Sequence, residues 1–317
     1  MKEIGGYFGM EELVNQEFYS GLVALNSGSN ALLYLLKARK ITKLHIPYYL
    51  CDSVSNLLEK YNYEFEYYHV DQEFQPIFDK ELEPGEYLYI VNLYGQFTQE
   101  KTLALKKHYG QLILDHSQAF FQKPLEGIDT IYSCRKYFGV PDGAYLATDA
   151  VLHEELEQDI SKDRMAHILG RFEGTASEYY ADFRSSNDLL AEAPLRKMSK
   201  LTRNLMGAID AERACRIRNE NYAYLEKQLG LDNPLNLTMP EGAFAYPLLV
   251  EDGISVRNRL AEQKIYIPLL WPNVIEDCPE ESIEYQYAAN ILPLPCDQRY
   301  GIEDMAYLVE MVKKQWI

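Results

Sequence analysis

The chain has 317 residues, of which 47% are hydrophobic and 25% are charged. It can therefore bury a sizeable core, and its length indicates two domains, or one large domain and one small one. The formal net charge of −17 excludes a broad electrostatic attraction to nucleic acid or anionic lipid, so we expect neither as a partner.

The cysteines and the apolar segments exclude further classes. The five cysteines show no CxxC spacing, so we expect no disulfide framework and no metal site. No segment approaches the run of about 18 apolar residues that a membrane helix needs, and residues 1–13 contain no signal-peptide core. We therefore expect a reduced, soluble, cytoplasmic protein that does not enter a membrane.

The first half of the chain alternates strand and helix patterns. In chain order the sequence predicts a helix at 31–40, a strand at 43–47, a helix at 51–61, strands at 63–70 and 87–95, a helix at 98–110 that stops at Gly110, and strands at 111–115, 130–134 and 143–148. This alternation is typical of an α/β fold with a mainly parallel sheet covered by helices. Ligands of such sheets bind beyond the carboxyl ends of the strands.

The second half has a different pattern. Residues 153–230 are helical and charged, and 195–230 form one long helix or two. The remaining segments predict a strand at 242–251, a helix at 256–263, strands at 264–272 and 291–295, and a terminal helix at 302–316. We therefore expect a large domain at 1–210 and a small C-terminal α+β domain at 211–317.

A possible phosphate site precedes the first helix. Ser27, Gly28 and Ser29 stand where free backbone N–H groups and the helix dipole bind an anion, and Gly28 allows a close approach. The alternative is an ordinary helix N-cap, which serine favours, and taken alone the N-cap is the better interpretation.

A carboxylate ends one of the predicted strands. Asp115 can pair with the nitrogen of a pyridine ring and keep that nitrogen protonated, or it can cap the following turn. Gln118 can reach a ring hydroxyl, and adjacent His116 is best read as a structural histidine.

A lysine follows another strand and precedes a turn rich in glycine, proline and aspartate. Lys136 can act as a nucleophile toward an aldehyde, and the neighbouring cation of Arg135 favours its free amine. Ser133 can add a hydroxyl to a phosphate site. The alternatives are a solvated pair of loop charges at 135–136 and a serine that only satisfies a strand end.

Two tyrosines follow the predicted strand 43–47. Tyr48 or Tyr49 can stack on an aromatic ligand, or both can belong to a core or a dimer interface. We assign Tyr49 as the candidate.

These features are more informative in order than singly. The chain presents a phosphate-type turn, an aromatic residue after a strand, a strand-end Asp115, and then Ser133 three residues before Lys136. Pyridoxal 5′-phosphate (PLP) needs a lysine for its aldehyde and an anion beside its pyridine nitrogen. The ordered set therefore predicts a PLP site.

Several segments resemble the DegT family of sugar aminotransferases, which have the aspartate-aminotransferase-like fold (fold type I). The matching segments are NSGSNALLYLL, IPYYLCDSV, NLYGQ, LDHSQAF, SCRKYFGVPDGAYL and ILPLPCDQRYGIEDM. The resemblance implies a PLP-binding large domain, a small C-terminal domain and a homodimer. It also implies that Lys136 holds PLP, that Asp115 meets the pyridine nitrogen and Gln118 the ring oxygen, and that four residues surround the phosphate: Ser27, Gly28, Ser29 and Ser133.

The chain also departs from the family pattern. Ser133 lies three residues before the lysine, where the family has a serine five residues before it, and 195–198 reads LRKM where the family has Asn-x-Arg-Met. We expect an aminotransferase that uses an amino donor such as glutamate and a keto-sugar acceptor linked to a nucleotide. The alternatives are another PLP enzyme (a lyase, a dehydratase or an amino-acid-directed transferase) and a family member that binds a ligand without turnover.

Overall fold

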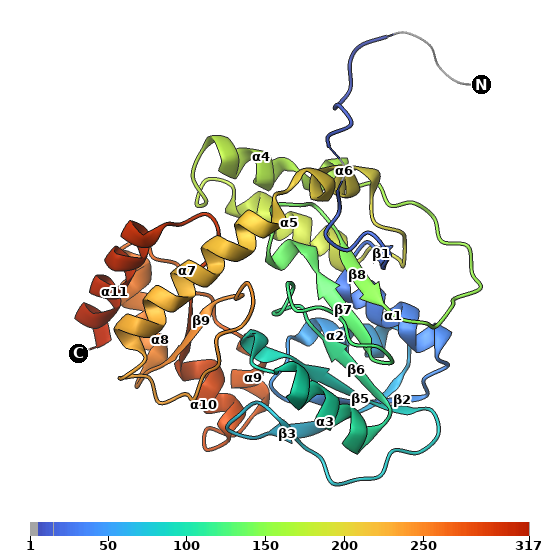
Figure 1. Cartoon of the computed structure of the whole chain (residues 1–317), viewed down its shortest axis with the longest axis horizontal. Helices are drawn as coiled ribbons and strands as arrows, with labels where there is room; N and C mark the ends of the chain where they lie inside the picture. The colour runs from blue at the N-terminus through green and yellow to red at the C-terminus, as the bar shows by residue number, and fades with distance from the viewer. Residues whose placement is uncertain (1–5, 15, 317) are drawn as a thin grey trace.

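The computed structural model describes residues 6–14 and 16–316. The start of the N-terminal stretch, residues 1–5, for which no signal peptide is expected, lies outside the described residues. In Figure 1 the chain forms a large α/β part and a smaller part built by its C-terminal third.

The large part is organised around an eight-stranded sheet in the order β1-β8-β7-β6-β5-β2-β3-β4. Its strands are β1 (Val23–Leu25), β2 (Lys43–Pro47), β3 (Glu64–Val70), β4 (Pro76–Ile77), β5 (Glu86–Val91), β6 (Leu112–Asp115), β7 (Asp129–Ser133) and β8 (Ala144–Ala147). The central strands β3, β2, β5, β6 and β7 are parallel, whereas β1, β4 and β8 pair antiparallel to their neighbours. The predicted α/β class with a mainly parallel mixed sheet is confirmed.

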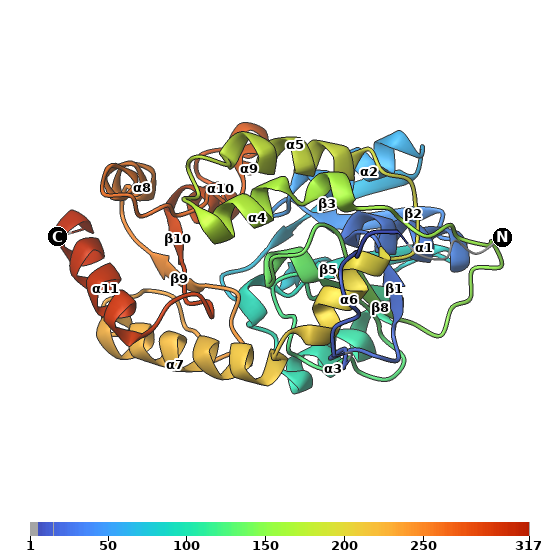
Figure 2. The same cartoon turned by 90° about the horizontal axis from the view of Figure 1, so that it is seen from above.

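Helices cover both faces of this sheet (Figure 2). They are α1 (Gly28–Ala38), α2 (Asp52–Lys60), α3 (Gln99–Tyr109), α4 (Ala166–Glu173), α5 (Tyr180–Ala191) and α6 (Lys200–Ala208), with short 3-10 turns η1 (Leu93–Gly95), η2 (Cys134–Lys136) and η3 (Lys162–Arg164). Gly110 caps α3 with φ +71°, a conformation that side chains rarely adopt, so the predicted helix stop is confirmed.

Helix α1 is the most deeply buried helix of the large part. Its seven consecutive residues from Asn30 to Leu36 are all buried, because α1 packs on β7 and β8 while other elements cover its outer side. A helix that is apolar on all sides needs such enclosure. Its buried Asn30 is satisfied by the Asn26 side chain and by the Ala193 and Pro194 carbonyls. The N-terminus of α1 is thereby held rigidly against the sheet.

The C-terminal third surrounds a two-stranded antiparallel sheet, β9-β10. Its elements are α7 (Ala211–Leu229), β9 (Tyr246–Leu249), α8 (Gly253–Glu262), α9 (Pro272–Asp277), α10 (Ile283–Asn290), β10 (Ile291–Leu294) and α11 (Ile302–Trp316). Figure 2 shows α7 running from the edge of the large part to α11, and α7 and α11 pack together. The segment 195–230 forms two helices, α6 and α7.

The predicted domain boundary at 210/211 falls between α6 and α7. The apolar side chains of α7, β9, β10 and α11 form one core cluster. The core cluster of the large sheet also recruits Trp271, Val274 and Tyr287 from the C-terminal third. The boundary stays a prediction, because the two parts share apolar contacts across it.

One expected strand is absent, so that prediction was wrong. The segment 264–272 forms no strand among the described residues; it is irregular up to α9. In the small sheet β9 pairs only with β10, so the apolar pattern of this segment reflects packing of Ile267 and Trp271 into cores rather than strand pairing.

Candidate active site

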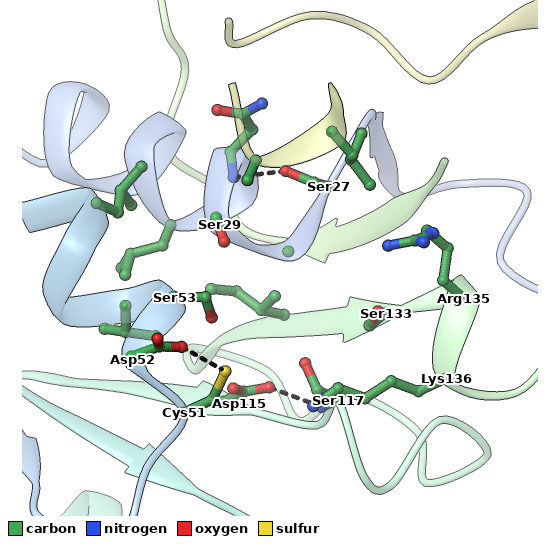
Figure 3. Close-up of a pocket in the computed structure, with 18 of the residues that line it drawn as sticks. Ser27, Ser29, Cys51, Asp52, Ser53, Asp115, Ser117, Ser133, Arg135 and Lys136 are labelled. Atoms are coloured by element: carbon green, nitrogen blue, oxygen red, sulfur yellow. Dashed lines mark hydrogen bonds between the residues drawn. The ribbon is translucent and has the colours of Figure 1, made fainter. Parts of the chain in front are cut away.

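A cavity of about 710 Å³ opens beyond the carboxyl ends of the parallel strands. Strand residues form its floor, and α1 and α2 approach it with their N-termini (Figure 3). Residues of α5 also line it. Its floor lies on one face of the sheet: Tyr89, Val91, Asp115, Ile131 and Ser133. Val91, Asp115 and Ile131 are register partners across three strands. Tyr89 lies two residues before Val91, and Ser133 lies two residues after Ile131. Because side chains alternate between the two faces of a strand, all five point to the same face.

The Asp115 carboxylate is buried and held by two donors. The Tyr89 hydroxyl donates to Oδ2 over 2.7 Å, and the Ser117 backbone N–H donates to Oδ1 over 2.7 Å. Burial and the neighbouring Asp115 raise the pKa of Tyr89 well above its ordinary value, so this hydroxyl keeps its proton and remains a donor. Two such bonds fix the orientation of the carboxylate.

Gln118 carries a buried donor without a partner. Its side chain is 1% exposed and lines the cavity. Its Oε1 accepts from the Tyr94 backbone N–H over 2.8 Å, whereas its Nε2 makes no hydrogen bond in the described part of the chain. An unpaired buried amide costs about 1–3 kcal/mol, so this atom indicates a ligand with an acceptor.

Lys136 lies at the end of η2, and its side chain is exposed to the cavity. In Figure 3 it extends toward Ser117 and Asp115. Lys136 also lines a second cavity of about 600 Å³ on the side of the C-terminal third. The amine therefore stands where two cavities meet.

The turn that follows Lys136 is anchored from behind. Asp142 is fully buried and accepts from the backbone N–H and the hydroxyl of Ser199, each over 2.8 Å, and from the Thr202 hydroxyl. Gly143 has φ +117°, and a Cβ there would lie 3.0 Å from the Thr202 side chain, so the turn needs glycine. The backbone around the lysine is therefore rigid.

The predicted phosphate turn also faces the cavity. Ser27 caps α1 by accepting from the Asn30 backbone N–H over 3.1 Å, so the ordinary N-cap interpretation is correct. Ser27, Gly28, Ser29 and Ser133 all line the same cavity. Capping and anion binding are compatible here, because the Ser27 hydroxyl proton and the other N–H groups of the first turn stay available.

The structure places Tyr49 away from the cavity. Its side chain is 0% exposed, its hydroxyl lies 3.3 Å from that of Tyr94, and its ring packs edge-on against Trp271 at 5.4 Å. Tyr48 stacks on Tyr67 instead. The placement of Tyr49 thus gives no support to stacking on a ligand; its core role was the alternative interpretation.

Four residues of the site were missed from the sequence. They are Tyr89, Arg135 as a cavity-lining side chain, Asn187 of α5 and Trp271 before α9. The sequence could have indicated Tyr89, because it lies two residues before Val91, the end of the strand that pairs with Asp115. Asn187 and Trp271 arrive from remote segments, which no local pattern could indicate.

The residues present fit PLP. The site offers a held carboxylate in Asp115, an unpaired donor in Gln118 Nε2 and a cavity-facing amine in Lys136. These are the partners that the ring nitrogen, the ring oxygen and the aldehyde of PLP require. Among the described residues, no group of three His, Cys, Asp or Glu is placed to hold a metal ion.

Comparison with known proteins gives structural relatives only. No protein-family model matches the chain, and no curated protein matches it. A DegT DnrJ EryC1 StrS aminotransferase from Brucella abortus is similar with a TM-score of 0.63 and 14% identity, over 94% of this chain and 87% of that one. NtdA from Bacillus subtilis with bound cofactor PMP is similar with a TM-score of 0.65 and 15% identity, over 93% of this chain and 73% of that one. DesI in the presence of its TDP-sugar product is similar with a TM-score of 0.62 and 13% identity, over 92% of this chain and 79% of that one.

The chain has the fold of these aminotransferases. The predicted fold type I is thereby confirmed, since the likeness extends over nearly the whole chain. None of the described helices is long and apolar enough to cross a bilayer.

Replacing Tyr89 by phenylalanine removes one donor from the buried Asp115. We expect Tyr89→Phe to lower the free energy of unfolding by about 1–3 kcal/mol, and by clearly less in an Asp115→Asn background, where no charge needs the donor. Denaturant unfolding of the four proteins measures this coupling. Tyr87→Phe is the matched control on the same strand, because its hydroxyl makes no hydrogen bond among the described residues. If Tyr89→Phe lowered the free energy of unfolding equally in the parent and in Asp115→Asn, the hydrogen bond between Tyr89 and Asp115 would not be the cause.

The stability of the protein should fall in mild acid because of His116. Burial lowers the pKa of His116 to about 4 from its ordinary 6.5, so the unfolded chain binds this proton at a higher pH than the folded chain. The contribution of neutral His116 to the free energy of unfolding is present above pH 6.5 and is lost as the pH falls toward 4, at up to about 1.4 kcal/mol per pH unit. Unfolding measured between pH 7 and pH 4 should show a shallower dependence for His116→Asn than for the parent. Replacement of exposed His153 should leave the slope unchanged.

Proposed function

We propose that the protein is a PLP-dependent aminotransferase that transfers an amino group from an amino acid such as glutamate to a keto sugar linked to a nucleotide. The observation that carries the proposal is the convergence of Lys136, Asp115 and Gln118 with the N-terminus of α1 on one cavity. Each of these groups has an ordinary explanation alone, whereas one cavity holding all of them fits a single ligand.

The chain's residues divide the work of holding this cofactor. Asp115, held by Tyr89, would meet the positive charge of the ring nitrogen, Gln118 Nε2 would donate to the ring oxygen, and Lys136 Nζ would hold the aldehyde group. When bound, PLP supplies an aldehyde that takes up amino groups and a ring that accepts electrons from the substrate carbon. Lys136 Nζ would also carry the proton that leaves and re-enters the reacting carbons.

The second cavity supports a bulky acceptor. It adjoins the first at Lys136 and is lined by Phe244, Tyr266, Tyr300 and Tyr307. Aromatic faces suit sugar and base rings, and two exposed cations on its wall, Arg171 and Lys264, suit phosphate groups. Neither cation forms an ion pair within the described part of the chain. The DesI structure with its TDP-sugar product supports the same class of acceptor.

Homodimer formation and a cytoplasmic location are further parts of the proposal. Helices α4 and α5 expose large apolar side chains at Leu169, Phe172, Tyr180 and Leu189, which supports burial against a second copy. All five cysteines are free, which supports a reducing compartment. Light scattering of the purified protein should give twice the chain mass, and a Phe172→Glu variant should shift it toward the monomer. A monomeric parent would contradict the dimer.

Addition of PLP to the purified protein should produce a yellow complex that borohydride fixes covalently. Lys136→Ala should lose the borohydride-fixed bond and lower turnover by several orders of magnitude, because both the covalent bond and the proton carrier are lost. Visible absorbance and peptide mass mapping measure these results. Lys60→Ala, which removes another amine of the same cavity, should keep the adduct.

The same absorbance separates the remaining alternatives. Conversion of bound PLP to its amine form by glutamate, and its reversal by a keto-sugar nucleotide, is the expected result. A protein that takes up no PLP would overturn the proposal. Binding without any conversion by amino donors would favour a ligand-binding protein or a different PLP reaction.

A further inference from the structure

Arg135 is a cavity-lining cation that the roles above leave unused. Its Nη2 donates to Asn187 Oδ1 over 2.6 Å, and its buried Nε has no hydrogen-bond partner among the described residues. No carboxylate of the described residues forms an ion pair with it, whereas Lys60, on the same cavity, is paired with Glu192 at 3.0 Å. Burial and nearby Arg164 lower the pKa of Arg135 to about 10, so it remains charged at neutral pH. Arg135 is partly buried, and a nearby anion would stabilise its charge.

The cavity gives Arg135 a suitable neighbourhood for an anion. Ser133 precedes it, and Ser27 to Ser29 begin α1 on the same cavity wall. In Figure 3 Arg135 extends to the side of Ser27 and Ser133, whereas Lys136 extends to the side of Asp115 and Ser117. Successive residues of η2 therefore serve opposite ends of the cavity. A helix N-terminus carries a partial positive charge of about half a unit, which adds to the guanidinium.

A separate observation points to a ligand in this cavity. Gln118, three residues after Asp115 on the same cavity, has a buried Nε2 with no partner among the described residues. An elongated molecule with an acceptor at one end and an anion at the other would satisfy both Gln118 and Arg135. The ordinary alternative, that Arg135 only ties η2 to α5, explains one of its nitrogens and leaves Nε unpaired.

We propose that Arg135, positioned by Asn187, is the cation that binds the phosphate group of the cofactor at the N-terminus of α1. This inference rests on the proposed function and deepens it, because it assigns a residue that the fold likeness does not. Arg135 supplies a full charge and directed N–H donors, Ser133 and Ser27 supply hydroxyls, and α1 supplies backbone N–H groups. Asn187 holds the guanidinium in the orientation that this contact needs.

The test compares PLP with pyridoxal, which lacks the phosphate, in a Lys136→Ala background where no covalent bond masks the affinity. Isothermal titration calorimetry should show that Arg135→Gln weakens PLP binding by about 10- to 100-fold, the range for one lost charged hydrogen bond, while pyridoxal binding stays within about twofold. Arg135→Lys should recover part of the loss, since it keeps the charge without the fork of donors. Inorganic phosphate should compete with PLP for binding to the Lys136→Ala protein, and it should not compete when Arg135→Gln is added to that protein.

Matched controls separate the possible outcomes. Lys60→Gln removes a cation of the same cavity that is already paired, and it should leave the ratio of PLP to pyridoxal affinity unchanged. Asn187→Ala should weaken PLP selectively and less than Arg135→Gln. An equal loss of PLP and pyridoxal affinity in Arg135→Gln, or no loss of either, would overturn the inference while leaving the proposed function intact. Absence of binding of PLP and pyridoxal by the unaltered protein as well as by Lys136→Ala would overturn the proposed function and this inference together.

Discussion

The parallel register of β5, β6 and β7 is the constraint on which the candidate site depends. Val91, Asp115 and Ile131 are partners across these strands, so their side chains meet on one face at the carboxyl edge of the sheet. A slip of one residue in β6 would turn Asp115 to the opposite face and separate its carboxylate from Tyr89. Backbone hydrogen bonding of buried apolar strands thus fixes the distance between a charged group and its donor. The polar site is a consequence of how the apolar residues pair.

Local patterns were sufficient where local chemistry decides the structure. The strand at 43–47, the stop at Gly110 and the helix at 302–316 agree with the structure because proline, glycine and helical periodicity act within a few residues. The segment 264–272 has the composition of a strand and fails to form one, since strand formation needs a partner edge and β9 pairs with β10. Asp115, Lys136 and the first turn of α1 were predicted to share one site from their order along the chain, and they line one cavity. The placement of Tyr49 in the core does not support its assignment to a ligand, and the sequence could not separate the two roles because an apolar core and a ligand ring attract the same side chain.

The site draws on elements with very different sequence separation. The strand edge supplies the carboxylate, η2 supplies the lysine and α1 supplies its first turn, all from the first 136 residues, whereas α5 adds Asn187 and the approach to α9 adds Trp271. Helix α5 and the segment before α9 can vary without disturbing the sheet, because they form walls of the cavity and take no part in strand pairing. The identities of 13–15% with proteins of the same fold fit this division. What these proteins share with this chain is the fold.

The position of Lys136 between two cavities has a stereochemical consequence. Lys136 belongs to the wall of both cavities, and the turn anchored by Asp142 fixes its backbone. Under the proposed function, a proton delivered from its amine would therefore arrive at one face of a planar carbon. The handedness of a newly formed amine would then be set by the wall that carries the lysine, and a substrate bound the other way up would yield the mirror-image centre.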